Sequence, residues 1–146
     1  MNDPIALLKK DHREVEVMLK ALLTSKPGVR RQATVKKLDA ALSLHMSIEE
    51  AHIYPLVAKR VDEDEAEEAG IEHGLVREGL ANLKELVAEP GFGAALAMLT
   101  AGIKHHVKEE EQEVFPELKR TLDRGEFAEL GDEVAEAKKA SRRSAR

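Results

Sequence analysis

Histidine and glutamate recur at the same spacing in two parts of this sequence. His45 is followed four residues later by Glu49, and His106 is followed four residues later by Glu110. Side chains at these positions lie on one face of a helix, so each pair can offer an imidazole nitrogen and a carboxylate oxygen to the same ion. The two pairs therefore predict a site for a metal cation.

The two pairs belong to an internal repeat that also contains other histidines, acidic residues, aromatic residues and prolines. A shift of 61 residues matches His12 with His73, His45 with His106, Glu49 with Glu110, Glu50 with Glu111, Tyr54 with Phe115, and Pro55 with Pro116. Each copy thus contains one isolated histidine followed by one histidine and glutamate pair. We expect the two copies to form similar halves of one fold.

The absence of cysteine narrows the chemistry that is available. The chain contains 6 histidines and no cysteine, which excludes disulfides, thiolate metal sites, haem attached through thioethers and a cysteine nucleophile. Any metal must therefore be held by nitrogen and oxygen atoms.

Composition favours an all-α fold built around one core. The 146 residues are 42% hydrophobic, 35% charged and only 3% aromatic, and residues with high helix propensity are prominent among them. A chain of this length buries enough apolar surface to fold without disulfides. Proline, glycine and polar turns divide it into predicted helices at 4–23, 29–61, 65–88, 94–122 and 126–140, with kinks at Pro55 and Pro116.

Apolar residues recur every three or four positions in the first four predicted helices, and polar side chains interrupt each of these stripes. The interrupting residues are His12, His45, Glu49, His73, His106 and Glu110. Short connections favour an up-down-up-down four-helix bundle with a pseudo-twofold axis, in which the interrupting residues lie at similar depth. We expect four imidazoles and two carboxylates to converge in the core.

Buried carboxylates need a compensating charge, because an unpaired ion in a protein core costs several kcal/mol. A metal cation supplies that charge. The six side chains are enough for two ions, with two imidazoles for each ion and two carboxylates that can bridge them. Mixed nitrogen and oxygen ligation favours iron or manganese over calcium and magnesium, and zinc is an alternative. A structural polar network without metal is the competing interpretation.

These residues resemble those of a known family. The segments HMSIEEAHIYP (residues 45–55) and HVKEEEQEVFP (residues 106–116), together with His12 and the EH pair at 72 and 73, are similar to hemerythrin-like, or HHE cation-binding, domains. The resemblance covers the first four predicted helices. It implies a four-helix bundle with a non-haem di-iron site, in which the four histidines are terminal ligands and Glu49 and Glu110 bridge the irons.

The sequence departs from the oxygen-carrying hemerythrins at one position. Those proteins have a further histidine four residues after the one in the third helix, where this chain has Arg77. The departure leaves a coordination position open, and open positions suit reaction as well as binding. The resemblance therefore implies a module that binds or senses dioxygen, nitric oxide, peroxide or iron. A di-iron enzyme that consumes peroxide or nitric oxide is the alternative.

Two other helical metal proteins fit the sequence less well. Ferritin-like carboxylate proteins combine a Glu-x-x-His motif on two helices with glutamates from two others, whereas only Glu49 and His52 match that motif on the stripes of this chain. A haem bundle with histidine and methionine ligands would leave the buried glutamates unexplained.

Several polar residues near the predicted site have alternative roles. His52 lies on its apolar stripe and matches Glu113 in the repeat, so the two could pair one turn beyond the metal site. A structural ion pair or partial exposure is favoured over metal ligation by His52. His105 lies beside its stripe and is interpreted as a surface residue. Glu16 and Arg77 occupy equivalent positions, where they either form a salt bridge with each other or face solvent.

Glu50 and Glu111 directly follow the two glutamates on the stripes. They fall on the neighbouring helix face, where they are either hydrated or accept a hydrogen bond from a ligand imidazole.

The chain is predicted to divide into a metal-binding bundle at 1–123 and a C-terminal helix with a basic tail at 124–146. The tail KKASRRSAR is expected to be solvated and frayed. A net charge of −5 predicts no nucleic-acid partner. No leader peptide or membrane-spanning run is recognised. We expect a cytoplasmic protein whose partner is a small diatomic or peroxide ligand.

Overall fold

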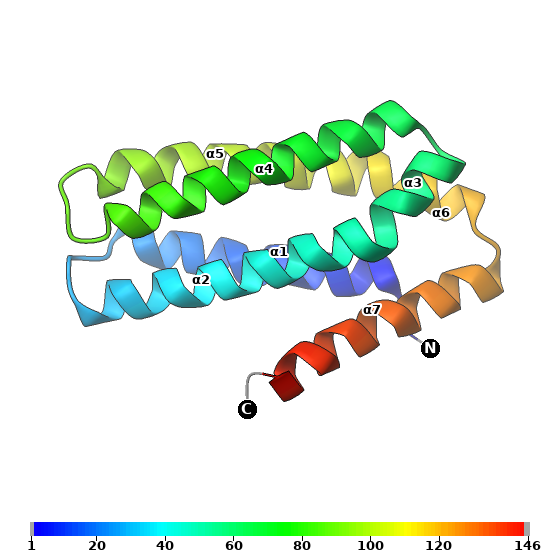
Figure 1. Cartoon of the computed structure of the whole chain (residues 1–146), viewed down its shortest axis with the longest axis horizontal. Helices are drawn as coiled ribbons and strands as arrows, with labels where there is room; N and C mark the ends of the chain where they lie inside the picture. The colour runs from blue at the N-terminus through cyan, green and yellow to red at the C-terminus, as the bar shows by residue number, and fades with distance from the viewer. Residues whose placement is uncertain (1, 145–146) are drawn as a thin grey trace.

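The computed structural model describes residues 2–144, which form an antiparallel bundle of helices (Figure 1). Four long helices form the bundle: α1 (Pro4–Leu23), α2 (Val29–Ile48), α4 (Glu63–Glu85) and α5 (Phe92–Glu109). Two short helices, α3 (Tyr54–Arg60) and α6 (Phe115–Thr121), extend it, and α7 (Arg124–Ser144) packs on its outside. No strand occurs in residues 2–144, and within them no helix has the length and apolar character needed to cross a membrane. The predicted all-α bundle is confirmed.

Several helix boundaries differ from the prediction. Helix α4 ends at Glu85 instead of residue 88, and α7 runs from Arg124 to Ser144 instead of 126–140. The starts of α4 and α5 follow from capping and burial. Helix α4 begins at Glu63 because the carboxylate of Asp62 accepts a hydrogen bond of 3.0 Å from the backbone N–H of Asp64. Helix α5 begins at Phe92, whose buried ring lies 4.0 Å from the guanidinium carbon of Arg31. Both helices therefore begin two residues before the starts at 65 and 94 that the proline, glycine and polar turns predicted.

A π-helical turn interrupts each of the two helices that contain an internal proline. These turns are η1 (Glu49–Ile53) and η2 (Glu110–Val114). Each ends with a backbone N–H, that of Tyr54 or of Phe115, donating to the carbonyl oxygen five residues earlier. Proline has no N–H and its ring collides with the carbonyl four residues before it, so a widened turn relieves that conflict. The interruption was predicted as a kink at the proline, and it takes the form of a π turn that precedes it.

Two apolar clusters fill the core, and the polar positions of the stripes lie between them. On α1, Leu8 belongs to one cluster and Val15 to the other, with buried His12 one turn from each. On α4, His73 is placed in the same way between Ala69 and Val76. The apolar layers exclude water on both sides and hold the polar layer at one level of the bundle.

Helix α7 is part of the packed core. Its residues Leu130 and Val134 are 3% and 0% exposed and belong to the same cluster as Leu8. Gly131 allows the close approach of the N-terminal segment, because a Cβ there would lie 1.9 Å from the carbonyl oxygen of Asn2. The basic tail, which was expected to be frayed, is helical through Ser144, and residues 145 and 146 lie outside the described part.

Candidate metal centre

One imidazole from each of the four bundle helices points into the core at the same level. These are His12 on α1, His45 on α2, His73 on α4 and His106 on α5, each at most 7% exposed. The Nε2 atoms of His12 and His45 are 3.2 Å apart, and the ring centroids of His73 and His106 are 4.9 Å apart. The structure thus brings together the four histidines that the sequence singles out.

The carboxylate of Glu49 lies among these rings and is fully buried. Its Oε1 atom is 3.2 Å from Nε2 of His45, on the same half of the repeat. The same oxygen is 3.1 Å from Nε2 of His73, on the other half. Glu49 is the first residue of η1, so the π turn begins at the point where this side chain enters the core.

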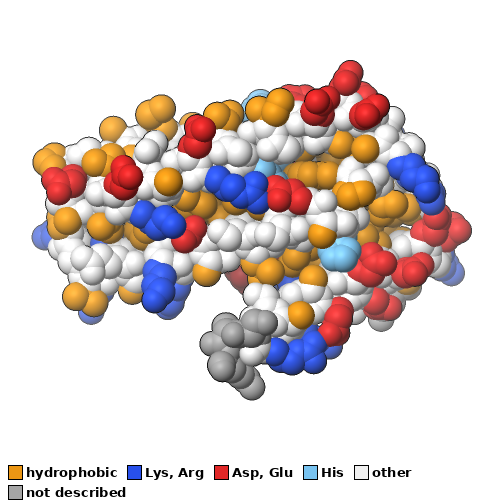
Figure 2. Space-filling model, viewed as in Figure 1, with side chains coloured by type: hydrophobic (Ala, Val, Ile, Leu, Met, Phe, Trp, Pro, Cys, Tyr) orange, Lys and Arg blue, Asp and Glu red, His pale blue; other side chains and the backbone are white. Residues whose placement is uncertain are grey.

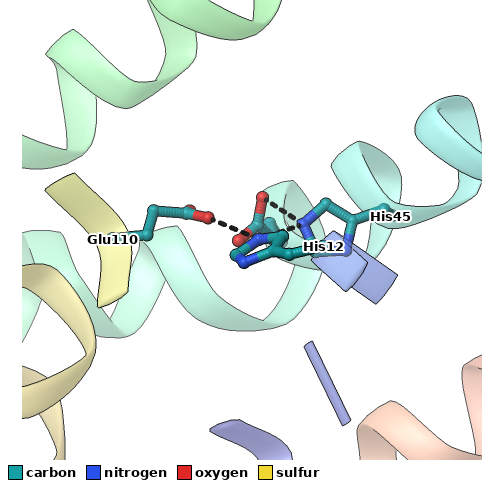
Figure 3. Close-up of side chains that lie close together, drawn as sticks. His12, His45 and Glu110 are labelled. Carbon is teal, nitrogen blue, oxygen red and sulfur yellow. Dashed lines mark hydrogen bonds and ion pairs between the residues drawn. The ribbon is translucent and has the colours of Figure 1, made fainter. Parts of the chain in front are cut away.

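Glu110 makes the matching contacts from the other half of the repeat. Its Oε1 atom is 3.2 Å from Nε2 of His12, and its Oε2 atom is 3.3 Å from Nε2 of His106. Figure 3 shows its side chain extending toward His12 and His45. Each of the two glutamates therefore contacts one imidazole from either half, as a carboxylate that bridges two ions would.

The hydroxyl of Tyr54 reaches the same centre, although sequence reasoning gave this residue no role. It donates a hydrogen bond of 2.6 Å to Oε2 of Glu110 and lies 3.2 Å from Oε1 of Glu49. It is also 3.0 Å from Nε2 of His73. In the other half of the repeat Phe115 occupies the equivalent position and stacks against a histidine ring. The sequence contained one sign of this role for Tyr54. The repeat matches Tyr54 with Phe115, and the two side chains differ by the hydroxyl group of Tyr54.

The Nδ1 atom of each central histidine is hydrogen-bonded to a carboxylate. The pairs are His12 with Glu111 (2.6 Å), His45 with Asp11 (2.8 Å), His73 with Glu50 (2.7 Å) and His106 with Glu72 (2.7 Å). Nδ1 donates in these bonds, so Nε2 is the nitrogen that faces the centre and could bind a metal. Of the two roles open to Glu50 and Glu111, hydrogen bonding to an imidazole is confirmed.

Asp11 and Glu72 were not predicted to take part. Each directly precedes a central histidine, and the shift of 61 residues matches one with the other. The repeated acid and histidine pair was therefore the signal that could have identified them. The signal was hard to interpret because each acid contacts a histidine other than the one it precedes. Asp11 contacts His45, and Glu72 contacts His106.

Cationic groups stand behind these outer carboxylates. Arg77 donates two hydrogen bonds to Glu50, at 2.9 and 2.8 Å, and Arg13 binds Glu111. Lys138 of α7 donates to Asp11. Among the described residues no lysine or arginine pairs with Glu72, whose second neighbour besides His106 is His105 at 3.6 Å. The salt bridge considered between Glu16 and Arg77 does not form, because η1 presents Glu50 to that guanidinium while Glu16 pairs with Arg13 and Lys20.

The two remaining histidines lie outside the centre. His52 is 3.5 Å from Glu133 of α7, so the pairing considered with Glu113 does not form because α7 covers this face of η1. Partial exposure of His52 within another ion pair, the favoured interpretation, is confirmed. The side chain of His105 is 64% exposed and contacts Glu109 at 3.0 Å, in agreement with its interpretation as a surface residue.

The charges in this layer depend on one another. Burial disfavours the cationic form of His45, yet the charge of Glu49 and the hydrogen bonds to Asp11 and Glu49 together outweigh this and raise the pKa of His45 to about 10. The pKa of His106 is likewise raised to about 11, against the effect of burial, by Glu110 and Glu49. Burial and the two carboxylates raise the pKa of Tyr54, which keeps the phenol neutral and able to donate. Without a metal, protons must therefore supply the positive charge in this layer.

The donor atoms fit a pair of metal ions. The ligand atoms form two groups, and within each group the atoms lie within 4.8 Å of one another. One group contains His12 and His45 and the other contains His73 and His106. Both groups include Glu49 and Glu110. Among the described residues, Oε2 of Glu49 and Oε1 of Glu110 are buried without a hydrogen-bond partner. A buried carboxylate oxygen that lacks a donor costs about 1–3 kcal/mol or more. A cation bound beside these atoms would remove that cost.

A small apolar cavity adjoins the four imidazoles. It has a volume of about 20 Å³, and its other lining residues are Val15, Leu42, Met46, Val76, Ile103 and Val107. Neither the two glutamates nor Tyr54 line it. The centre therefore has an apolar side formed with the histidines and a polar side formed by carboxylates and a phenol.

Comparison with known proteins agrees with this arrangement. The family model of the hemerythrin HHE cation binding domain matches residues 3–118. A crystal structure of a hemerythrin HHE cation binding domain-containing protein from Mycobacterium kansasii has a TM-score of 0.85, with 24% identity, over 99% of this chain and 90% of that one. No curated protein matches the sequence. Because the family model spans all four long helices and the buried histidine and glutamate cluster, the chain belongs to the hemerythrin HHE cation-binding domain family.

Proposed function

We propose that the chain binds two iron ions between the four central imidazoles and the carboxylates of Glu49 and Glu110. The observation that carries this proposal is the position of the glutamates, each within 3.3 Å of one imidazole from either half of the repeat. His12 and His45 would hold one ion, and His73 and His106 the other. The unpartnered oxygens of both carboxylates support a shared, bridging role.

Iron is proposed over other cations because of the set of donor atoms. Imidazole and carboxylate together suit iron and manganese, whereas calcium and magnesium prefer shells made of oxygen. The phenol of Tyr54 adds an oxygen donor 3.0 Å from Nε2 of His73. Structural zinc sites are closed and tetrahedral, which two ligand groups that share both carboxylates do not resemble.

We propose further that the centre binds a small molecule such as dioxygen, nitric oxide or peroxide. The apolar cavity beside the histidines, at about 20 Å³, offers room for little more than one water-sized molecule. Valine, isoleucine, leucine and methionine side chains surround it and keep bulk water away from the rings. Iron in such a site supplies the redox chemistry and the affinity for small ligands, while the chain supplies orientation, a dry cavity and fixed charges.

An enzyme that consumes peroxide or nitric oxide is the second candidate, and Tyr54 favours it. Its hydroxyl holds a proton beside the buried oxygens of Glu49 and Glu110. Its raised pKa keeps that proton in place at neutral pH. Cleavage of an oxygen–oxygen bond builds negative charge on oxygen, so a neutral hydroxyl that donates a hydrogen bond at the centre is useful to a catalyst and is not needed for reversible binding.

Metal titration tests the proposal directly. The chain is stripped with a chelator, titrated anaerobically with ferrous iron and then analysed for metal and protein. We expect two irons per chain, and binding of fewer than two would overturn the dinuclear assignment. Adding peroxide to the reduced, loaded protein separates the two candidate functions, because less than one product per pair of irons would eliminate the peroxidase version.

A further inference from the structure

Acidic side chains gather on one face of the bundle, where α4 lies against α5, η2 and α6. Figure 2 shows acidic side chains over the start of α4, at the upper right of the view. On the side of α4 that faces α5, Glu65, Glu68 and Glu72 come from successive turns. Glu109 and Glu113 face them from the end of α5 and from η2.

A cavity of about 50 Å³ lies between these five glutamates. Its remaining lining residues are Ala69, Val114, His106 and Glu110. His106 and Glu110 belong to the metal centre, so the inner wall of the cavity is formed by two of the proposed ligands. The cavity therefore extends from an exposed acidic surface to the buried cluster.

No basic side chain neutralises the glutamates at the middle of this cavity. Among residues 2–144, neither lysine nor arginine lies within salt-bridge distance of Glu65, Glu68 or Glu113. Burial and the neighbouring carboxylate of Glu117 raise the pKa of Glu65 to about 7. Acidic groups held this close repel one another, so the arrangement costs stability unless a cation occupies it.

Two further observations point to a cation as the ligand. Glu110, which lines the cavity, has a side chain that is 1% exposed, and its Oε1 atom, 3.2 Å from Nε2 of His12, accepts no hydrogen bond from the described residues. Near the surface, Glu72, His105 and Glu109 each offer one ligand atom, and these atoms lie within 4.8 Å of one another. Potential ligands for a cation thus stand at both ends of the cavity.

The repeat provides an internal comparison. In the other half, the positions equivalent to Glu65, Glu68 and Glu109 are Pro4, Leu7 and Ile48. These residues are covered by α7, whose Leu130 and Val134 pack into the same apolar cluster. Glu65, Glu68 and Glu109 therefore occur only on the half of the bundle that α7 leaves uncovered, whereas Glu72 matches the acidic Asp11 and Glu113 matches His52.

We propose that divalent cations enter the metal centre through this cavity, with Glu72, His105 and Glu109 as a transient binding site near the surface. The inference rests on the proposed metal-binding function and adds a route to it. A cleft lined by charge of one sign concentrates counter-ions and raises association rates by about 10- to 1000-fold. Carboxylates with few other contacts bind hard cations loosely enough to release them inward.

The rate of metal loading tests this route. A variant with Glu65→Gln, Glu68→Gln and Glu113→Gln removes three charges and alters none of the proposed ligands. The metal-free protein is mixed with Co²⁺ in a stopped-flow instrument, and the visible absorption of the bound ion is followed. We expect loading to be at least about tenfold slower, with a weaker dependence on salt, and the same final content of two ions.

The matched control is Glu78→Gln, Glu85→Gln and Glu89→Gln, which removes the same charge from exposed positions toward the other end of α4 and beyond it. Loading of this control should be close to that of the unmodified chain. Equal slowing in both variants, or no slowing in the first, would overturn the route while leaving the metal centre in place. Failure of the unmodified chain to bind two ions would overturn the proposed function, and the route with it.

Discussion

The hydroxyl of Tyr54 donates a hydrogen bond of 2.6 Å to Oε2 of Glu110, which comes from the opposite half of the repeat. The equivalent residue, Phe115, has no such group and stacks on the ring of His12, with centroids 6.1 Å apart. The two halves of the centre are therefore chemically different even though their backbones repeat. One of the two proposed ions would have a phenol beside it and the other an apolar ring.

Replacing Tyr54 with Phe tests the importance of this difference. In the metal-free protein the change leaves Oε2 of Glu110 without its short hydrogen bond, which should lower the free energy of unfolding by about 1–3 kcal/mol. Denaturant unfolding measures this loss. In the iron-loaded protein we expect two ions to remain and the visible spectrum to change.

The reverse change, Phe115→Tyr, is the matched control because it adds the same atom to the other half. An unchanged spectrum and unchanged stability for Tyr54→Phe would contradict a role for the phenol at the centre.

Replacing His106 with Ala should lower the affinity for iron by at least about tenfold, because it removes one of the two imidazoles proposed for one ion. Metal analysis after dialysis against a competing chelator gives the result. His52→Ala is the control, since His52 lies 3.5 Å from Glu133 near the surface and is not a proposed ligand, so the change should leave the iron content unchanged. Two irons retained by the His106 variant would refute the ligand assignment.

Replacing Lys138 with Met should weaken metal binding although Lys138 contacts no proposed ligand. Lys138 donates to Asp11, which in turn is 2.8 Å from Nδ1 of His45. Loss of such a supporting group typically lowers metal affinity by about tenfold or more. A competition titration should find the defect in this variant and none in Lys139→Met, whose side chain is exposed. Equal affinities would show that the contact of α7 with Asp11 is only structural.

Replacing Glu65 with Gln should stabilise the protein at pH 8 and have little effect near pH 4.5. Burial and Glu117 raise the pKa of Glu65 from 4.5 in the unfolded chain to about 7 in the folded one. The stability gained from the bound proton is fully present below the unfolded pKa and is lost as the pH rises through the folded pKa. Glutamine cannot undergo this loss. We expect a rise in Tm of about 3 °C at pH 8, the shift for roughly 1 kcal/mol in a chain of this size.

The comparison for that prediction is Glu117→Gln, which relieves the same repulsion from the other partner. Thermal melts of the metal-free proteins across this pH range should give similar curves for both variants. A gain in Tm that is as large at pH 4.5 as at pH 8 would indicate another cause.

The bundle and its convergent polar layer follow from the sequence because both depend on local periodicity. His12 and His73 lie on the apolar stripes of their helices, so in a four-helix bundle their side chains were expected to point into the core, as they do. The spacing of His45 and Glu49 similarly placed both groups on one face, and they lie 3.2 Å apart in the structure.

The roles of Asp11, Lys138 and Tyr54 could not be predicted, because they depend on contacts between segments that are distant in the sequence or on a local change of helix type. Asp11 supports His45 rather than its neighbour His12, and the pairing depends on the rotation of α1 against α2, which no spacing along one helix reveals. Lys138 lies 127 residues from Asp11. Tyr54 turns inward after a π turn, which moves every later side chain by a fraction of a turn relative to a regular α-helix.

The contact between Lys138 and Asp11 also bears on when this centre is finished during protein synthesis. A ribosome that has made all four long helices has not yet exposed the lysine that holds Asp11 against His45. We therefore expect His45 to reach its final orientation only after α7 has been made, and the proposed metal ions to bind with full affinity only from that point on.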